Sequence, residues 1–181
     1  MMTDTALLVI DVQDSFKHRD YWTDELFVPY QKKQNQLIHH ARQQGWEVVF
    51  VLHNEKSGVF SPESGYVRLM DFLDKQADDQ VFNKHVHNAL LESGLHEHLQ
   101  AKGITKLVVS GIRTEQCCET TTRVGSDLGY EVDFVVDATL TFPMHDPFTD
   151  KLVSVEEIQQ RTCLVLNQRF AKICWTEEYA G

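Results

Sequence analysis

Short runs of apolar residues recur along the chain, and polar segments long enough for helices separate them. Four runs rich in Val, Ile and Leu are typical of buried parallel strands and lie at 6–11, 47–53, 106–111 and 132–138. Two weaker strand candidates lie at 80–84 and 170–175. Between the strands, residues 35–44 predict a helix that Gly45 ends, and Ser154 and Glu157 have the spacing of a capping box that starts another helix.

This alternation predicts an α/β fold, with six mainly parallel strands in a doubly wound sheet and helices on both faces. The length of 181 residues, without a repeat or a linker-like stretch, predicts one domain over residues 1–181. Sheets of this kind bind ligands at the carboxyl ends of their strands. Functional residues are therefore expected where the apolar runs stop.

Composition narrows the function classes. A formal net charge of -10 argues against nucleic acid as a partner, because binding a phosphate backbone needs clustered Lys and Arg. No apolar run is long enough to span a membrane, and residues 1–10 lack the features of a secretory signal, so we expect a cytoplasmic protein with no membrane partner. The four cysteines have no CxxC spacing and are expected to be free thiols.

Three reactive side chains stand where apolar runs stop. Asp11 closes the first run, Lys84 closes the run at 80–84, and Cys117 follows the run at 106–111. Taken singly, the three residue types are common as a turn residue, a solvated lysine and a core cysteine. Taken together at one edge of a sheet, they describe a thiol nucleophile with an adjacent base and an ammonium that make thiolate more available.

Helical spacing distinguishes Cys117 from Cys118. If Thr114 caps the helix that follows, one stripe of that helix packs on the sheet and consists of Cys118, Thr121 or Thr122, Gly125 and Leu128. Cys118 then belongs to the core. Cys117, about 100° further round the first turn, faces the crevice at the positive end of the helix dipole.

Three segments give the chain a family resemblance: "LLVIDVQDSF", "FNKHVHNAL" and "VVSGIRTEQCCETTTRVGSDLGYEVDFVVDAT". They resemble the isochorismatase-like cysteine hydrolases, a superfamily that includes nicotinamidases, N-carbamoylsarcosine amidases, ureidoacrylate amidohydrolases and isochorismatases. The resemblance implies a three-layer α/β/α Rossmann-like sandwich and a catalytic triad of Asp11, Lys84 and Cys117. It also implies a cis peptide at Ile112–Arg113, an oxyanion hole formed by the backbone N–H groups of Arg113 and Cys117, and a homodimer or homotetramer.

The substrate site is less well defined by the sequence. Metal-bearing nicotinamidases carry an Asp-x-His segment and further histidines after the second strand, whereas residues 51–65 contain His53 alone, so we expect no metal and no other cofactor. The pairs His85/His87 and His96/His98 do not have converging ligand spacing. Aromatic residues near strand ends, which are candidates for lining a small-molecule pocket, are Phe16, Trp22, Phe60 and Phe142. Arg113 and His145 are candidates for contact with a polar or anionic substrate group.

The sequence thus predicts a cysteine-dependent hydrolase of a small amide, carbamoyl or ureido C–N bond, acting through a thioester. One alternative is a vinyl ether hydrolase of the isochorismatase type, which would use Asp11 and would not need the thiol. A non-catalytic binding or assembly protein, and a redox role for the adjacent thiols of Cys117 and Cys118, are further alternatives. The chain lacks the G-x-G-x-x-G motif of dinucleotide-binding proteins, so a dinucleotide-binding function is disfavoured.

Overall fold

A computed structural model describes residues 3–179, and its centre is a six-stranded sheet in which all neighbouring strands are parallel. The strand order is β3-β2-β1-β4-β5-β8. The strands are β1 (Thr5–Ile10), β2 (Glu47–His53), β3 (Gln80–Lys84), β4 (Lys106–Ile112), β5 (Glu131–Leu140) and β8 (Lys172–Cys174). The predicted parallel sheet is confirmed; the ends of the predicted domain, residues 1–2 and 180–181, lie outside the described residues.

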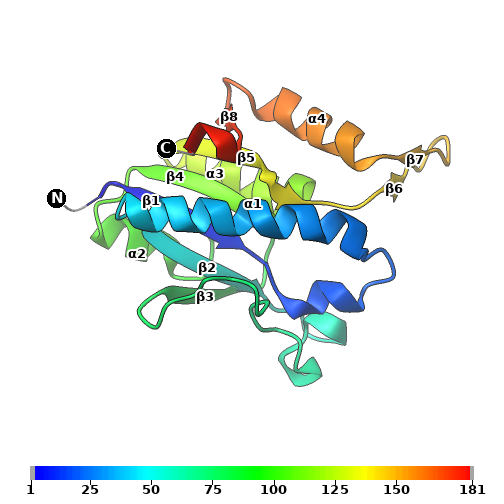
Figure 1. Ribbon diagram of the computed structural model, residues 1–181, viewed down its shortest axis with the longest axis horizontal. Coiled ribbons are helices and arrows are strands. Elements are labelled where there is room, and N and C mark those ends of the chain that lie inside the picture. The colour runs from blue at the N-terminus through cyan, green and yellow to red at the C-terminus, as the bar shows by residue number, and fades with distance from the viewer. Residues whose placement is uncertain (1–2, 180–181) are drawn as a thin grey trace.

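Helices cover both faces of this sheet (Figure 1). Helix α1 (Asp24–Gln43) lies across one face, and α2 (Leu95–Ala101) and α3 (Glu119–Asp127) lie on the other. Helix α4 (Val155–Leu166) extends to one side with the small hairpin of β6 (Met144–His145) and β7 (Leu152–Val153). No helix within residues 3–179 combines the length and the apolar character needed to cross a bilayer.

The core consists of two apolar layers, one on each face of the sheet. Alternate side chains of β1 divide between them, because successive side chains of a strand point to opposite faces. Leu7 and Val9 pack with α1, while Leu8 and Ile10 pack with α2 and α3, and all four are fully buried. This two-sided burial explains why β1 is a continuous apolar run.

Two helix starts test the sequence prediction. The capping box at Ser154 is confirmed, since its side chain accepts from the Glu157 N–H and the Glu157 carboxylate accepts from the Ser154 N–H. Helix α1, however, begins at Asp24 and not at residue 35. Thr23 caps it by accepting from the Glu25 N–H, and Phe27 and Tyr30 already face the core in the first turns. The prediction missed this part because Pro29 and several polar residues interrupt the apolar pattern.

Candidate active site

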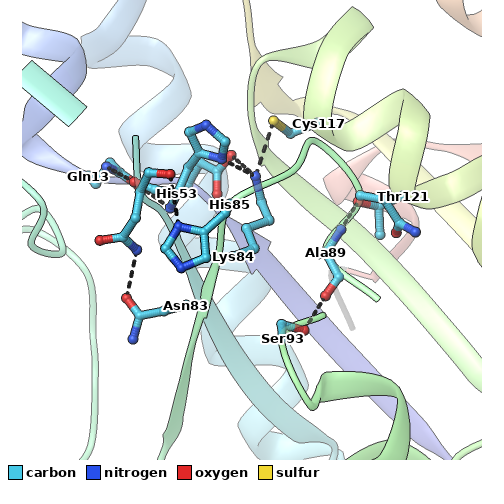
Figure 2. Close-up of polar contacts among 12 residues, drawn as sticks. Gln13, His53, Asn83, Lys84, His85, Ala89, Ser93, Cys117 and Thr121 are labelled. Carbon is cyan, nitrogen blue, oxygen red and sulfur yellow. Dashed lines mark hydrogen bonds and ion pairs between the residues drawn. The ribbon is translucent and has the colours of Figure 1, made fainter. Parts of the chain in front are cut away.

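The carboxyl ends of β1, β3 and β4 bring Asp11, Lys84 and Cys117 together. Figure 2 shows Lys84 and Cys117 at this place. The Lys84 Nζ lies 2.8 Å from Asp11 Oδ2 and 3.3 Å from Cys117 Sγ. The three residues are nearly inaccessible to solvent, with exposed fractions of 1%, 0% and 7%. The sequence prediction that these side chains meet in one place agrees with this geometry.

The backbone at the end of β1 aims Asp11 at this site. Asp11 has a φ of 55°, a left-handed conformation that Asp adopts more readily than most residues, and its N–H donates to Val51 O at 2.9 Å. Gly111, in β4, allows the close approach of the neighbouring strand. A Cβ on Gly111 would lie 2.0 Å from Ile10 O, and its φ of 126° is also unfavourable for other residues.

Cys117 lies in a π-helical turn, Thr114–Cys118, that leads into α3. In this turn the Cys118 N–H donates to Arg113 O, a span of five residues. The expected cap at Thr114 is wrong, because its hydroxyl is bonded to Thr139 Oγ1 at 2.7 Å and the turn begins without a side-chain cap. Cys118 is nevertheless fully buried in the core while Cys117 lines a cavity, as expected.

The predicted core stripe of α3 holds for three of its positions. Cys118 and Gly125 are buried, and at the threonine position between them both Thr121 and Thr122 are buried. Leu128 does not belong to the stripe, since it is the C-cap residue and is 47% exposed.

The backbone before Cys117 has the form that the family resemblance implied. The peptide bond between Ile112 and Arg113 is cis. The N–H groups of Gln116 and Cys118 donate to Arg113 O, whereas the N–H of Arg113 itself has no acceptor among residues 3–179. An N–H free of protein acceptors at the entrance of this turn is available to a bound ligand.

Burial and charge together set the protonation of the three groups. Burial raises the pKa of Cys117, the Asp11 charge raises it further, and Lys84 opposes both. Burial also raises the pKa of Asp11 against the effect of Lys84. Burial by itself lowers the pKa of Lys84, but the charges of Asp11 and Cys117 outweigh it and raise that pKa. Burial has the largest effect on Cys117, so these shifts favour a neutral thiol beside Lys84 and Asp11 in the resting site.

A cavity of about 260 Å³ opens onto this site. It is lined by Asp11, Phe16, Arg19, Tyr21, His53, Glu55, Phe60, His87, Arg113, Gln116 and Cys117. Phe16 and Phe60 thus face the cavity and touch each other edge to face, with ring centroids 4.9 Å apart. Arg19, Tyr21 and Glu55 are not predicted from the sequence, because a loop pattern does not indicate which side chains turn inward.

Three other candidates lie away from this cavity. Trp22 and Phe142 do not line it; Phe142 is fully buried behind Tyr21, with ring centroids 4.8 Å apart, and Trp22 packs against Phe142. His145 is exposed in β6, where its ring contacts Asp150. Phe142 supports the cavity wall from behind. The guanidinium of Arg113, which lines the cavity, lies over the rings of both Tyr21 and Phe142.

Other hollows and clusters lack this chemistry. A groove of about 690 Å³ runs along α4, β5 and β8, and none of Asp11, Lys84 and Cys117 lines it. Within residues 3–179, no three His, Cys, Asp or Glu side chains are grouped so that they could hold a metal ion. The polar groups suited to covalent chemistry are therefore those in the smaller cavity.

Comparison with known proteins gives consistent matches over most of the chain. The isochorismatase domain family matches residues 5–178. The isochorismatase family protein YddQ of Bacillus subtilis is 30% identical, with 97% of this chain and 98% of that protein covered. Nicotinamidase 3 of Arabidopsis thaliana is 30% identical over 76% of this chain and 73% of that protein. A crystal structure described as a putative isochorismatase hydrolase from Oleispira antarctica is 27% identical and has a TM-score of 0.85. The match covers 100% of this chain and 100% of that chain.

Proposed function

The chain belongs to the isochorismatase family, and from that premise we propose that it is a hydrolase that cleaves a small amide-type C–N bond through a thioester on Cys117. The observation that carries the proposal is the contact of one buried ammonium, Lys84 Nζ, with both Asp11 at 2.8 Å and Cys117 at 3.3 Å. A thiol beside a base and a fixed positive charge is the arrangement that nucleophilic catalysis requires.

In the proposed first step, the Asp11 carboxylate takes the proton from Cys117 Sγ while the sulfur attacks the carbonyl carbon of the substrate. The raised pKa of Cys117 means that this proton is still present when substrate binds, so proton transfer accompanies attack. The raised pKa of Asp11 makes its carboxylate a better acceptor for that proton. As the proton moves to Asp11, the negative charge passes from the carboxylate through the sulfur to the carbonyl oxygen of the substrate, and Lys84 offsets the part that develops on the sulfur.

The second step releases the amine and regenerates the enzyme. Asp11, now protonated, donates its proton to the leaving nitrogen as the C–N bond breaks, and an acyl group remains on Sγ. A water molecule then attacks the thioester carbon and gives a proton to Asp11. The acid leaves, and the sulfur takes that proton back from Asp11.

We propose that backbone N–H groups stabilise the oxyanion in both steps. The Arg113 N–H, which lacks an acceptor within residues 3–179, and the Cys117 N–H are the proposed donors. Loss of a single donor of this kind costs roughly 10²–10³ in rate in other acyl-transfer enzymes. Both donors belong to the backbone, so this part of the site does not depend on side-chain identity.

Cavity size and family chemistry limit the substrate. A volume of about 260 Å³ suits a small molecule, since drug-sized ligands occupy cavities of roughly 300–1,000 Å³. The relative Nicotinamidase 3 is named for an amide substrate. Primary amides, carbamoyl compounds and ureido acids of small size are the classes that we propose. Phe16 and Phe60 provide an apolar wall for the part of the substrate next to the carbonyl.

The test is release of ammonia or amine from a panel of these three classes, measured for the native protein beside Cys117→Ala. The proposal expects turnover of at least one class and its loss in Cys117→Ala. Cys118→Ala is the matched control, because it removes the neighbouring thiol, which lies in the core. Hydrolysis that persists without the Cys117 sulfur would contradict a thioester mechanism.

Two other functions make distinct predictions in the same experiment. A vinyl ether hydrolase would turn over an isochorismate-type substrate in Cys117→Ala and lose activity in Asp11→Asn. A non-catalytic family member would turn over none of the panel. The buried contact of Lys84 with both Asp11 and Cys117 favours the hydrolase, because a protein without this chemistry has no need to keep a charged pair in its core.

We also propose that the chain assembles into a homodimer or homotetramer, as the family resemblance implies. The exposed Leu164 and Trp175 in the groove along α4 are apolar surface that an assembly would cover. Light scattering coupled to gel filtration measures this directly, and a monomer at high concentration would contradict it.

A further inference from the structure

Lys84 makes a third contact in the site that the triad does not include. Its Nζ lies 3.1 Å from Nδ1 of His53, in addition to its contacts with Asp11 and Cys117. Figure 2 shows His53, Lys84 and Cys117 close together. A lysine ammonium has three N–H donors and no acceptor. Lys84 is fully buried, so its three donors correspond to three protein acceptors: a carboxylate, a sulfur and an imidazole nitrogen.

From this geometry we propose that His53 is a positioning residue of the catalytic site: its neutral imidazole accepts a hydrogen bond from Lys84 and holds the ammonium between Asp11 and Cys117. The inference rests on the proposed function, because it assigns His53 a role through Lys84 in that chemistry.

The hydrogen bond fixes the tautomer of His53. Because Lys84 can only donate, Nδ1 must carry the lone pair, and the ring proton is on Nε2. That nitrogen lies 3.7 Å from Glu55 Oε1 at the cavity wall. Burial, followed by the charge of Lys84, lowers the pKa of His53 to about 4, so the ring is neutral in the physiological range. The other titratable groups that face it are His85 and His87, which follow β3.

The fold places His53 by two independent means. Strands β2 and β3 pair in parallel with His53 in register with Lys84, so the two residues lie side by side. The fully buried side chain of Gln13 then binds both backbone groups of His53: its Oε1 accepts from the N–H at 2.7 Å, and its Nε2 donates to the C=O at 3.0 Å. Gln13 lies two residues after Asp11, so the segment that carries Asp11 also fixes the position of His53.

Removal of this acceptor has a specific consequence. One N–H of a buried ammonium would lose its partner, and a hydrogen bond to a charged group contributes more than a neutral one. The ammonium would then move from its place or give up its charge more easily. Lys84 lowers the pKa of Cys117, and either change weakens this effect. The thiol should therefore become harder to ionise.

The experiment compares His53→Leu, His53→Asn and the control His85→Leu. Asn offers an oxygen acceptor near the position of Nδ1, whereas Leu offers none. His85 is exposed, adjoins Lys84 in sequence and does not line the cavity, so its loss should leave the site intact. The readout is the rate of Cys117 alkylation by iodoacetamide between about pH 7 and pH 10, followed by peptide mass spectrometry, which needs no substrate.

We expect His53→Leu to slow alkylation of Cys117 by about 10- to 100-fold near pH 8 and to move the pH profile upward, as the loss of a charged hydrogen bond implies. His53→Asn should stay within about 3-fold of the native rate, and His85→Leu should match it. A native rate in His53→Leu, or equal slowing in the Asn and Leu variants with unchanged melting temperatures, would overturn the inference. If only the proposed function is wrong, the result is different: the native protein does not hydrolyse any amide of the panel, but the alkylation rates of the variants keep the order given above.

Discussion

Replacement of Lys84 by Met is the substitution whose effect the structure specifies most fully. Met keeps the length of the side chain and removes the charge. Lys84 and Asp11 have side chains that are 0% and 1% exposed, so the carboxylate would lose its partner in a place that water does not reach. Asp11 Oδ1 already lacks a hydrogen bond within the described residues, which leaves little else to stabilise the anion.

The expected cost at neutral pH is about 3–5 kcal/mol in the free energy of unfolding, the range for breaking a buried ion pair by removal of one partner. The cost depends on pH in a defined direction. Without Lys84, desolvation raises the pKa of Asp11 further above its unfolded value. A carboxyl with a raised folded pKa is harmless while both states are protonated, and it destabilises the fold as pH rises from the unfolded pKa through the folded one.

Urea denaturation from about pH 4 to pH 8 measures this effect for the native protein, Lys84→Met and the double variant Lys84→Met/Asp11→Asn. We expect the loss in free energy of unfolding caused by Lys84→Met to be largest near pH 8 and to become smaller toward pH 4. The double variant should recover most of it, because an uncharged Asn leaves no anion to stabilise. A pH-independent penalty, or one below about 1 kcal/mol at neutral pH, would refute the assignment of Lys84 and Asp11 as a buried ion pair.

Three further predictions concern the neighbouring residues. Because burial raises the pKa of Cys117, its alkylation rate should keep rising between about pH 7 and pH 10, past the ordinary thiol pKa of ~8.5, whereas a plateau below that value would mean a thiolate at rest. Cys118→Ala should lose about 1 kcal/mol of stability, because it leaves a small cavity in the core, and should keep hydrolysis within a few-fold of native; a loss as complete as that of Cys117→Ala would show that the two thiols were assigned in the wrong order. Gly111→Ala should destabilise the fold by more than about 3 kcal/mol in thermal unfolding, because its Cβ would lie 2.0 Å from Ile10 O; a native melting temperature would contradict the packing of β1 against β4.

Local sequence patterns predict most of the fold. The central strands are predicted from apolar runs because both faces of the sheet are buried there, which leaves few polar positions inside β1 or β4. Strand ends then led to Asp11, Lys84 and Cys117, since parallel strands present their carboxyl ends at one edge. The family resemblance added the cis bond before Arg113, which no local propensity indicates.

The parts that were missed depend on contacts between distant segments. Thr114 looked like a helix cap, but the partner of its hydroxyl is Thr139 in β5, which the local sequence does not reveal. The sequence places a base and an ammonium near Cys117 but does not show how completely burial desolvates its sulfur, which raises the pKa of the thiol. His53 stood alone in its segment; its register with Lys84 in the neighbouring strand gives it a partner, and a strand alignment of 47–53 with 80–84 was the one sequence signal that could have suggested this.

In the proposed mechanism, the sulfur of Cys117 carries the acyl group of the substrate. Rapid quenching during turnover of an active amide, followed by intact-protein and peptide mass spectrometry, tests it directly. We expect an added mass equal to the acyl group, located on Cys117, absent from Cys117→Ala and reduced in Asp11→Asn. Steady turnover with no adduct under conditions where hydrolysis of a thioester is slowed, or an adduct on another residue, would contradict it.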